Sequence, residues 1–205
     1  MRYVEDHRRQ THDRIVENAS YGLRQKGAEG LSVVDLMKLA GLTHGGFYNH
    51  FESRAALVSE AIAFAMDQTT DRWKKLANGK TSRERFEALI ADYLSLRHRD
   101  NPKQGCALPT LAVDVARSNP SAQQALASKL EKMIDALVGL LPDEPQARQI
   151  ATGAIATMVG SIVLSRAVGA GKLSDRILDA GRKTAGGRTR KPQRRTTKAT
   201  RCEKS

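Results

Sequence analysis

The sequence has 205 residues, of which 40% are hydrophobic and 27% charged, and its formal net charge is +12. That length suits one good hydrophobic core or two modest ones. Two cysteines exclude a disulfide framework, and the polar first residues lack the apolar run of a secretory signal, so we expect a cytoplasmic protein.

The positive charge is concentrated near the C-terminal end. Residues 184–205 hold eight basic side chains against one acidic side chain, a net of +7. A basic chain suits a polyanionic partner, nucleic acid before an anionic membrane surface. Because most of the charge lies in this segment, the high isoelectric point does not show that the folded part binds DNA. The segment has no large apolar residue, which predicts a disordered basic tail.

The first 52 residues predict a small helical domain. An apolar stripe at helical spacing indicates a first helix over residues 7–26, and Gly27 is suited to end it. Ser32 and Asp35 have the spacing of a capping box, which predicts that a second short helix begins at Ser32. A glycine ends that helix, and a third follows over residues 43–50.

The remaining chain predicts six further helices separated by Asn, Gly and Pro turns. Their expected ranges are 53 to the mid-70s, 81–99, 106–117, 121–141, 146–168 and 172–182. We find no strand alternation and no fixed repeat. The prediction is an all-α chain of about nine helices, with a small domain over 1–52, a larger helical domain over 53–183, and the tail over 184–205.

One predicted helix is long enough to span a membrane. Residues 150–171 carry a single charge, Arg166, but they are rich in Ala, Gly, Ser and Thr, which insert weakly. The segment also lacks flanking aromatic residues. We interpret it as a buried or dimer-forming helix and expect no membrane partner.

Residues 32–57 have the layout of a helix-turn-helix, in which the second helix enters the DNA major groove. Hydroxyls and exposed N–H groups at helix starts suit phosphates, and His, Asn and backbone groups can reach base edges. The expected phosphate contacts are Ser32, Thr43, Tyr48, His50 and Arg54; the expected base-reading residues are His44, Gly45 and Asn49. For Ser32, a purely structural role as helix cap is an equal alternative.

Residues 43–51, Thr-His-Gly-Gly-Phe-Tyr-Asn-His-Phe, followed by Ser53, Arg54 and Leu57, resemble the signature of TetR-type transcriptional regulators. The likeness covers about residues 10–60. It implies an N-terminal three-helix DNA-binding domain joined to a helical ligand-binding and dimerisation domain. It also implies a homodimer on a two-fold symmetric operator in double-stranded DNA, usually a repressor that a small-molecule inducer releases.

The sequence departs from that pattern at two positions. His44 stands where Lys is common, which weakens the attraction to phosphate at neutral pH. Gly46 follows Gly45 where a hydroxyl residue is common, and each Gly lowers helix propensity by about 1 kcal/mol relative to Ala. The glycine pair either allows the backbone to approach DNA closely or leaves the third helix loose until it is bound.

Cys106 has two interpretations. It lies at the expected start of a helix near Lys103, where a thiol pKa falls and the reactive thiolate is favoured. Residues 105–120 also resemble a subgroup of these regulators with a Gly-Cys at this point, and some relatives sense electrophiles or oxidants through cysteine. The alternative is a small buried packing residue, the commoner fate of a free cysteine.

Two further surfaces are expected in the regulatory half. An inducer pocket would lie among its helices, lined by Phe64, Trp73, Phe86, Tyr93, Leu111 and Met158, although each of these is also an ordinary core residue. Small residues at helical spacing would let two helices approach closely across a two-fold axis, together with the end of the 121–141 helix. This predicted dimer interface comprises Gly153, Thr157, Gly160, Ser161 and Leu164.

Other functions are less well supported. We find no nucleophile elbow, phosphate loop, paired metal-ligand motif or dinucleotide fingerprint, so we expect no enzyme, no metal and no cofactor. The alternative to a specific regulator is a non-specific basic DNA-binding protein driven by the tail at 184–205.

Overall fold

The computed structural model describes residues 2–76, 81–141 and 144–186. Within these ranges the chain forms nine α-helices, two 3-10 helices and no strand, which confirms the predicted all-α fold. The α-helices are α1 (Arg2–Lys26), α2 (Val33–Leu39), α3 (Arg54–Leu76), α4 (Ser82–Tyr93), α5 (Leu96–Asp100), α6 (Leu108–Ala116), α7 (Pro120–Val138), α8 (Ala147–Ala167) and α9 (Lys172–Gly186). The 3-10 helices are η1 (His44–Asn49) and η2 (Pro102–Gln104).

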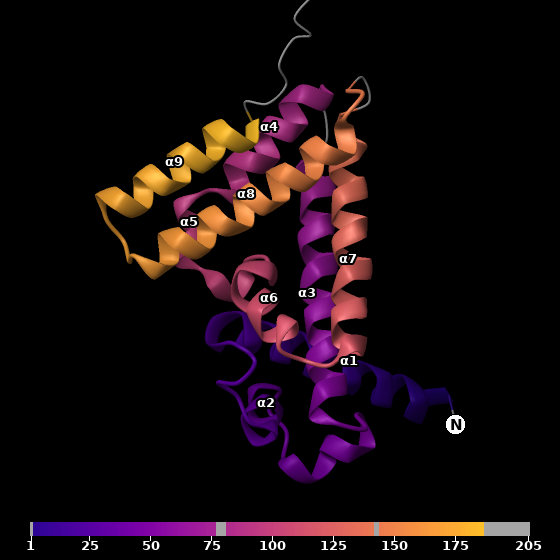
Figure 1. The fold of residues 1–205 in the computed structure, drawn as a ribbon. Coiled ribbons are helices and arrows are strands. Elements are labelled where there is room, and N and C mark those ends of the chain that lie inside the picture. The colour runs from indigo at the N-terminus through magenta and orange to yellow at the C-terminus, as the bar shows by residue number, and fades with distance from the viewer. Residues whose placement is uncertain (1, 77–80, 142–143, 187–205) are drawn as a thin grey trace, which may run out of the picture.

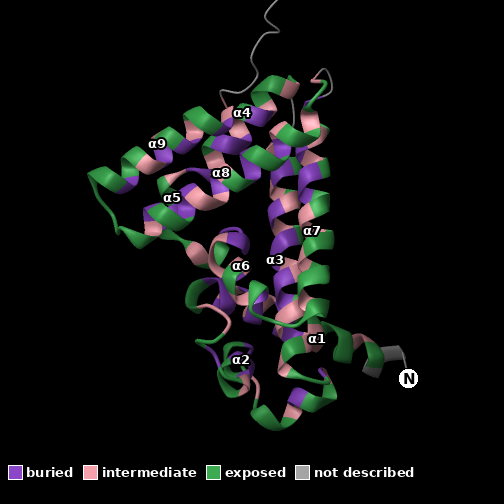
Figure 2. Cartoon of the chain, viewed as in Figure 1, coloured by how far each residue is buried: buried purple, intermediate pink, exposed green. Residues whose placement is uncertain are grey.

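The helices form a small lower unit and a larger upper unit (Figure 1). α1, α2 and η1 lie together at one end, while α4, α5, α8 and α9 lie at the other. α3 and α7 run side by side between them, and α6 packs against both α1 and α8. Buried side chains follow the inner faces of these helices along the whole length of the molecule (Figure 2). The lower unit is therefore in contact with the upper unit through α1, α3 and α6.

Capping boxes start two helices, and the first of them is the predicted one at Ser32. The Ser32 hydroxyl accepts a hydrogen bond from the Asp35 amide at 3.2 Å, and the Asp35 carboxylate accepts one from the Ser32 amide at 2.9 Å. Thr81 and Glu84 make the same reciprocal pair at the start of α4. Each box satisfies backbone donors that the first helical turn leaves without partners.

The third helix differs from the prediction, because residues 44–49 form a 3-10 helix and not an α-helix. Its bonds run from i to i+3, as in the His50 amide to the Phe47 carbonyl at 2.9 Å. Gly45 and Gly46 account for the difference, since two of the six residues of this short segment have low α-helix propensity.

The predicted 81–99 helix is broken after Tyr93. Ser95 accepts a hydrogen bond from the His98 amide at 3.2 Å and caps a new short helix, α5. Its hydroxyl donates to the Asp92 carbonyl at 2.7 Å, which closes the end of α4. Serine favours helix N-caps, and here it restarts a helix within an otherwise periodic apolar segment. The break turns His98 and Arg99 into the interior.

Two helix ends also differ from expectation. α1 begins at Arg2, before the expected residue 7. α9 continues to Gly186 with Ala185 buried, so residues 184–186 belong to a helix and not to the predicted tail. The rest of that prediction, residues 187–205, lies outside the described residues.

Candidate functional site

The helix-turn-helix is built on two aromatic side chains. Phe47 of η1 is fully buried and Phe51 nearly so, and their rings stack with centroids 5.6 Å apart. They pack in one core with Leu36 and Met37 of α2. This core fixes η1 against α2 and determines which residues of the 43–50 segment face outward.

The outward residues include most of the predicted DNA contacts. Tyr48 is 71% exposed, with its ring edge-on to Phe47 at 5.1 Å. Thr43 precedes η1 and its side chain makes no capping hydrogen bond, so its hydroxyl remains available to a ligand. The remaining exposed members are Ser32, His44, Gly45 and Asn49. The Ser32 hydroxyl is already engaged by Asp35 at 2.6 Å, which supports its capping role.

Arg54 lies in a different environment from the one expected. Its Nε and Nη2 donate to the Leu31 carbonyl at 3.3 and 2.9 Å, and Nη2 also contacts the Ala28 carbonyl. The guanidinium therefore holds the loop between α1 and α2, where carbonyl groups lack helical partners. This internal bonding competes with the predicted phosphate contact.

His50 is half-buried and its Nδ1 has no hydrogen-bond partner among the described residues. Burial lowers the pKa of His50, and the nearby His12 and Arg8 lower it further. The neutral imidazole is therefore favoured at this position, so a contact to phosphate would use one neutral N–H donor and no added charge.

α1 supplies contacts that sequence reasoning missed. Arg8 donates to the Asn49 carbonyl at 2.6 Å, and the His12 ring stacks on Phe51 at 4.5 Å. His12 also pairs with Glu60 of α3 at 2.7 Å. These partners are about forty residues apart in sequence, so no short sequence pattern predicts the contacts. Arg8 is exposed beside η1 and adds a positive charge to the same surface.

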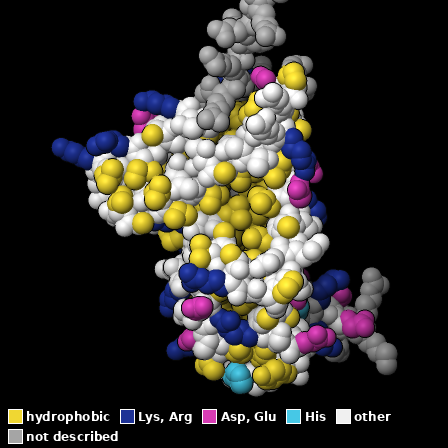
Figure 3. Space-filling view, in the orientation of Figure 1, with side chains coloured by type: hydrophobic (Ala, Val, Ile, Leu, Met, Phe, Trp, Pro, Cys, Tyr) yellow, Lys and Arg dark blue, Asp and Glu magenta, His cyan; other side chains and the backbone are white. Residues whose placement is uncertain are grey.

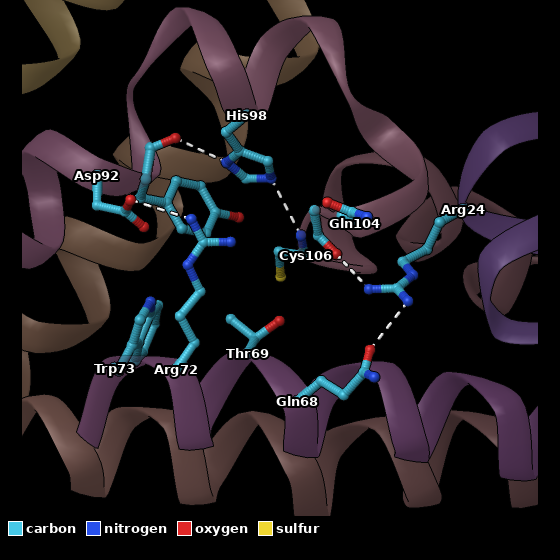
Figure 4. A pocket seen from close by; sticks show the side chains of 11 residues that line it. Arg24, Gln68, Thr69, Arg72, Trp73, Asp92, His98, Gln104 and Cys106 are labelled. Carbon is cyan, nitrogen blue, oxygen red and sulfur yellow. Dashed lines mark hydrogen bonds and ion pairs between the residues drawn. The ribbon is translucent and has the colours of Figure 1, made fainter. Parts of the chain in front are cut away.

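The cavity of the regulatory half is polar and small, with a volume of about 40 Å³ (Figure 4). Of the predicted pocket residues only Trp73 and Tyr93 line it. Phe86, Leu111 and Met158 are buried core residues and Phe64 is half-buried, so these four do not line this cavity. A second, smaller and mainly apolar pocket lies between α3 and α7. The other residues that line the polar cavity are Arg24, Gln68, Thr69, Arg72, Asp92, His98, Gln104, Gly105 and Cys106.

Cys106 lies on this cavity but does not begin a helix. α6 starts at Leu108, and the Cys106 amide donates to His98 Nε2 at 3.0 Å. The side chain is 3% exposed, and burial raises the pKa of the thiol. The expected lowering of that pKa is therefore wrong, because desolvation of the thiolate outweighs the neighbouring hydrogen bonds and the charge of Arg24.

His98 is a neutral bridge within the wall of the cavity. Its Nδ1 donates to the Tyr93 carbonyl at 2.7 Å, while its Nε2 accepts the Cys106 amide. Burial lowers the pKa of His98 to about 4, and the charges of Arg166, Arg72 and Arg24 act in the same direction. A Cβ at Gly105 would stand 2.5 Å from the His98 ring, so glycine is required for this close packing. Among the described residues no group of three or more His, Cys, Asp or Glu side chains is placed to hold a metal ion.

Comparison with known proteins identifies the lower unit. Residues 15–61 match the family described as bacterial regulatory proteins, tetR family. That match spans the second half of α1, all of α2 and η1, and the start of α3. The lower unit therefore belongs to the TetR family of transcriptional regulators. The chain is also 24% identical, over 75% of its length and 83% of the other protein, to the uncharacterised HTH-type transcriptional regulator Rv0196 of Mycobacterium tuberculosis.

One further relative is similar in sequence, and two solved structures are similar in fold. The chain is 30% identical over 77 residues, 37% of its length and 38% of the relative, to the HTH-type transcriptional repressor KstR2 of Rhodococcus jostii. A TetR transcriptional regulator from Chloroflexus aurantiacus superposes with a TM-score of 0.74 at 23% identity, covering 91% of this chain and 96% of that one. The reduced form of E. coli NemR gives a TM-score of 0.74 at 18% identity, over 86% and 95% of the two chains.

α8 of this TetR-family regulator carries an open apolar face. A Cβ at Gly153 or Gly160 would meet no atom within 4 Å, and Leu164 is 56% exposed. Thr157 is half-buried, whereas Ser161 is buried against Gly181 of α9 within the subunit. Figure 3 shows hydrophobic side chains gathered over α8 and the start of α9.

By length and composition α8 is the one described helix that could cross a membrane. This is weak evidence for a membrane span, because core helices of soluble proteins pass the same test.

Proposed function

We propose that this TetR-family regulator is a repressor that binds a two-fold symmetric operator as a homodimer and leaves it when a small-molecule inducer binds the regulatory half. The observation that carries the proposal is the exposed η1 surface held by the buried Phe47–Phe51 pair. A rigid aromatic core positions Tyr48, Thr43 and Asn49 together on an open surface. The repressor KstR2, which this chain resembles over 77 residues, supports the direction of regulation.

The contacts to DNA divide by chemistry. Thr43 and Tyr48 each offer one hydroxyl to phosphate oxygens, and the positive charge of Arg8 attracts the backbone. His44, Gly45 and Asn49 are the base-reading residues, with Asn suited to adenine in the major groove. Ser32, His50 and Arg54 mainly stabilise the fold of the DNA-binding unit, since their side chains are hydrogen-bonded or half-buried within it. The protein acts by binding and not as an enzyme, in the cytoplasm.

The homodimer uses the open face of α8. Gly153, Gly160 and Leu164 leave room for a second helix at close range. The end of α7 buries Met133 and Leu137 inside its own subunit, so α9, with Leu173 half exposed, replaces it as the second helix of the interface. Ser161 is excluded from the interface, because it lies against α9. Gly160→Lys should give a monomer in sedimentation, while Gln124→Lys on the exposed face of α7 should leave the dimer intact.

A thiol-reactive inducer is not favoured by the cavity. Cys106 is buried and burial raises the pKa of its thiol, which keeps it protonated and slow to react. Mass spectrometry after a mild electrophile should find Cys106 unmodified in the folded protein. Rapid modification of Cys106, together with loss of DNA release in Cys106→Ser, would instead establish a thiol sensor.

A gel shift with the DNA upstream of the gene tests specific binding. Labelled DNA is titrated at several salt concentrations against unlabelled competitor of the same or scrambled sequence. We expect affinity to fall with salt while the preference for one sequence persists, because base contacts do not depend on counterion release. Equal competition by scrambled DNA at every salt concentration would rule out an operator.

The second candidate is non-specific DNA binding by the basic segment, favoured by its net charge of +7 over 184–205. Because α9 extends to Gly186, the deletion that tests it should remove residues 187–205 only. The operator proposal expects the truncated protein to keep its sequence preference with weaker overall affinity. Complete loss of binding would make the segment the DNA-binding element.

A further inference from the structure

Arg24 is a buried cation without an anionic partner. The side chain is 2% exposed and lies in α1, facing the cavity from one side (Figure 4). It donates to the Ser20 carbonyl, the Ser20 hydroxyl, the Gln68 amide oxygen at 3.0 Å and the Gly105 carbonyl at 2.7 Å. All four acceptors are neutral, and none of the charges acting on Arg24 is a carboxylate. Four bonds leave one of the five guanidinium N–H groups, on Nη1, without an acceptor.

Other charges near the cavity are compensated. Asp92 pairs with Arg72 at 3.0 Å and with Arg97 at 2.6 Å, so its carboxylate is not available to Arg24. His98 is neutral and uses both ring nitrogens in hydrogen bonds. Buried charges in proteins are normally paired, because an unpaired charge loses its hydration without a replacement. Of the two arginines that line the cavity, Arg24 is therefore the one without a carboxylate partner.

Tyr93 presents a second unmet group to the same cavity. Its side chain is 3% exposed, and no described residue satisfies its hydroxyl. The neighbouring Cys106 thiol helps to raise the pKa of Tyr93, but sulfur is only a weak hydrogen-bonding partner. Arg166 lies close behind Gly105, and its Nη1 is likewise buried without a partner. Arg166 does not line the cavity, but the Tyr93 hydroxyl and the remaining Arg24 N–H belong to residues that do. Two such donors without an acceptor favour a ligand that carries negative charge.

We propose that this cavity binds a small oxyanion, or the carboxylate head group of a small organic acid, between Arg24 and the Tyr93 hydroxyl. The volume of about 40 Å³ exceeds what one water needs and is far below that of a drug-sized pocket. The cavity is open on the side of exposed Gln104 and part-exposed Arg72, where the rest of an organic acid would emerge. Oxyanion oxygens would accept from both unmet donors and neutralise Arg24.

Arg24 also connects the cavity with the DNA-binding unit. Its carbonyl accepts the Thr110 hydroxyl at 3.0 Å, and the Ala28 amide donates to Asp114 at 2.7 Å, so α6 holds the end of α1. Near its other end, α1 contacts η1 through Arg8 and His12. An anion bound to the remaining N–H draws the guanidinium towards Tyr93, weakens its bonds to Gly105 and Gln68, and shifts α1 against α3. That this shift releases DNA rests on the proposed function; the anion site itself does not.

Tyr93→Phe tests the site with little change in shape. Thermal unfolding and calorimetric titration are measured with sodium acetate and with sodium phosphate, against sodium chloride at equal ionic strength. We expect a saturable stabilisation of the wild-type protein by acetate, phosphate or both. The variant should unfold at a higher temperature without anion, because it no longer buries an unsatisfied hydroxyl, and should bind the anion about tenfold more weakly.

Tyr21→Phe is the matched control, since the Tyr21 hydroxyl bonds Glu17 and not the cavity. It should bind the anion as the wild-type protein does. Acetate alone would identify an organic acid head group, and phosphate alone an inorganic oxyanion. No saturable effect of either anion, or equal affinity in Tyr93→Phe, would overturn the site. Anion binding that does not release bound DNA would refute the coupling but not the anion site. The anion site can be tested even if the protein has no operator.

Discussion

The DNA-facing unit and the regulatory interior place their polar groups in opposite ways. In the first, the Thr43 and Tyr48 hydroxyls are exposed on a short segment whose apolar residues, Phe47 and Phe51, are buried. In the second, Arg24 and His98 are buried, and their bonds join segments distant in sequence. The first arrangement exposes hydrogen-bond donors to a large polyanion outside the protein. The second places hydrogen-bond donors around a small internal cavity. Binding surfaces for macromolecules and for small ligands thus require different sequence patterns.

Phe47 and Tyr48 are adjacent in η1 and should separate the core role from the DNA-binding role most clearly. Phe47→Ala should destabilise the protein by about 3–5 kcal/mol, because it empties a fully buried aromatic site that joins η1 to α2. Chemical denaturation followed by circular dichroism, at fixed protein concentration, measures the change.

The control for Phe47→Ala is Phe47→Leu, which keeps most of the apolar volume and should cost less than about 1.5 kcal/mol. A loss below about 1 kcal/mol in the alanine variant would mean that Phe47 does not hold the recognition segment, and the contrast between core and surface would fail there.

The DNA-facing unit could be predicted closely because its signals are local. The capping box of Ser32 and Asp35 lies within four residues and determines where α2 begins. Gly41 adopts a φ of 71°, which glycine tolerates, and ends α2 as expected. The 3-10 geometry of η1 was not predicted, although Gly45 and Gly46 carried the signal for a weakened α-helix. Propensity indicates such a weakening but not which alternative hydrogen-bond pattern replaces it.

The buried His98 of the upper unit should make the stability of the protein depend on pH. Burial lowers the pKa of His98 from 6.5 to about 4, so the unfolded chain takes up a proton first as pH falls. The stabilisation from neutral His98 is complete above pH 6.5 and is lost between 6.5 and about 4. The unfolding free energy should fall by about 3 kcal/mol over this window, since one pKa unit corresponds to about 1.4 kcal/mol.

Denaturant titrations at several pH values, compared with His98→Gln, isolate this contribution. The variant should be less stable at pH 7 and should lack the part of the pH slope due to His98. The pKa of His50 is lowered too, so some slope should remain in the variant. Identical slopes in both proteins would show that His98 is not held neutral by its surroundings.

The cavity itself could not be predicted from sequence, for a physical reason. Arg24 meets Gly105, 81 residues away, and the Ser95 cap that turns His98 inward interrupts a segment with continuous helical periodicity. Apolar residues such as Met158 were expected to line a pocket, yet they pack against one another. Polar residues from five segments leave the unfilled space. Cys106 was not expected to line a cavity, and tertiary burial reversed the expected direction of its pKa shift.

Tyr48→Ala should weaken operator binding with little effect on folding. The side chain is 71% exposed, so stability should change by no more than about 0.5 kcal/mol. Loss of its phosphate contact should reduce affinity about tenfold, equivalent to about 1.4 kcal/mol. Gel shift and thermal unfolding on the same preparation separate the two effects. Unchanged affinity would remove Tyr48 from the DNA surface, whereas a large fall in stability would place it in the core.

The smallest effect should come from Gly45→Ala, and it bears on why η1 is a 3-10 helix. A Cβ at Gly45 would meet no atom within 4 Å, and its backbone is not in the left-handed region. The substitution should therefore stabilise the protein by about 0.5–1 kcal/mol by reducing the freedom of the unfolded chain. Gly41→Ala is the matched control, because its Cβ also meets nothing but its φ is 71°. There the same methyl group should be destabilising.

Operator binding by Gly45→Ala then decides between the two interpretations of the glycine pair. Tighter binding by the stabilised variant would mean that η1 is loosely formed until it meets DNA, since a pre-ordered segment loses less entropy on binding. Weaker binding despite higher stability would mean that the backbone approaches the DNA too closely for a methyl group. Equal melting behaviour of the Gly45 and Gly41 variants would contradict the backbone geometry from which the prediction is made.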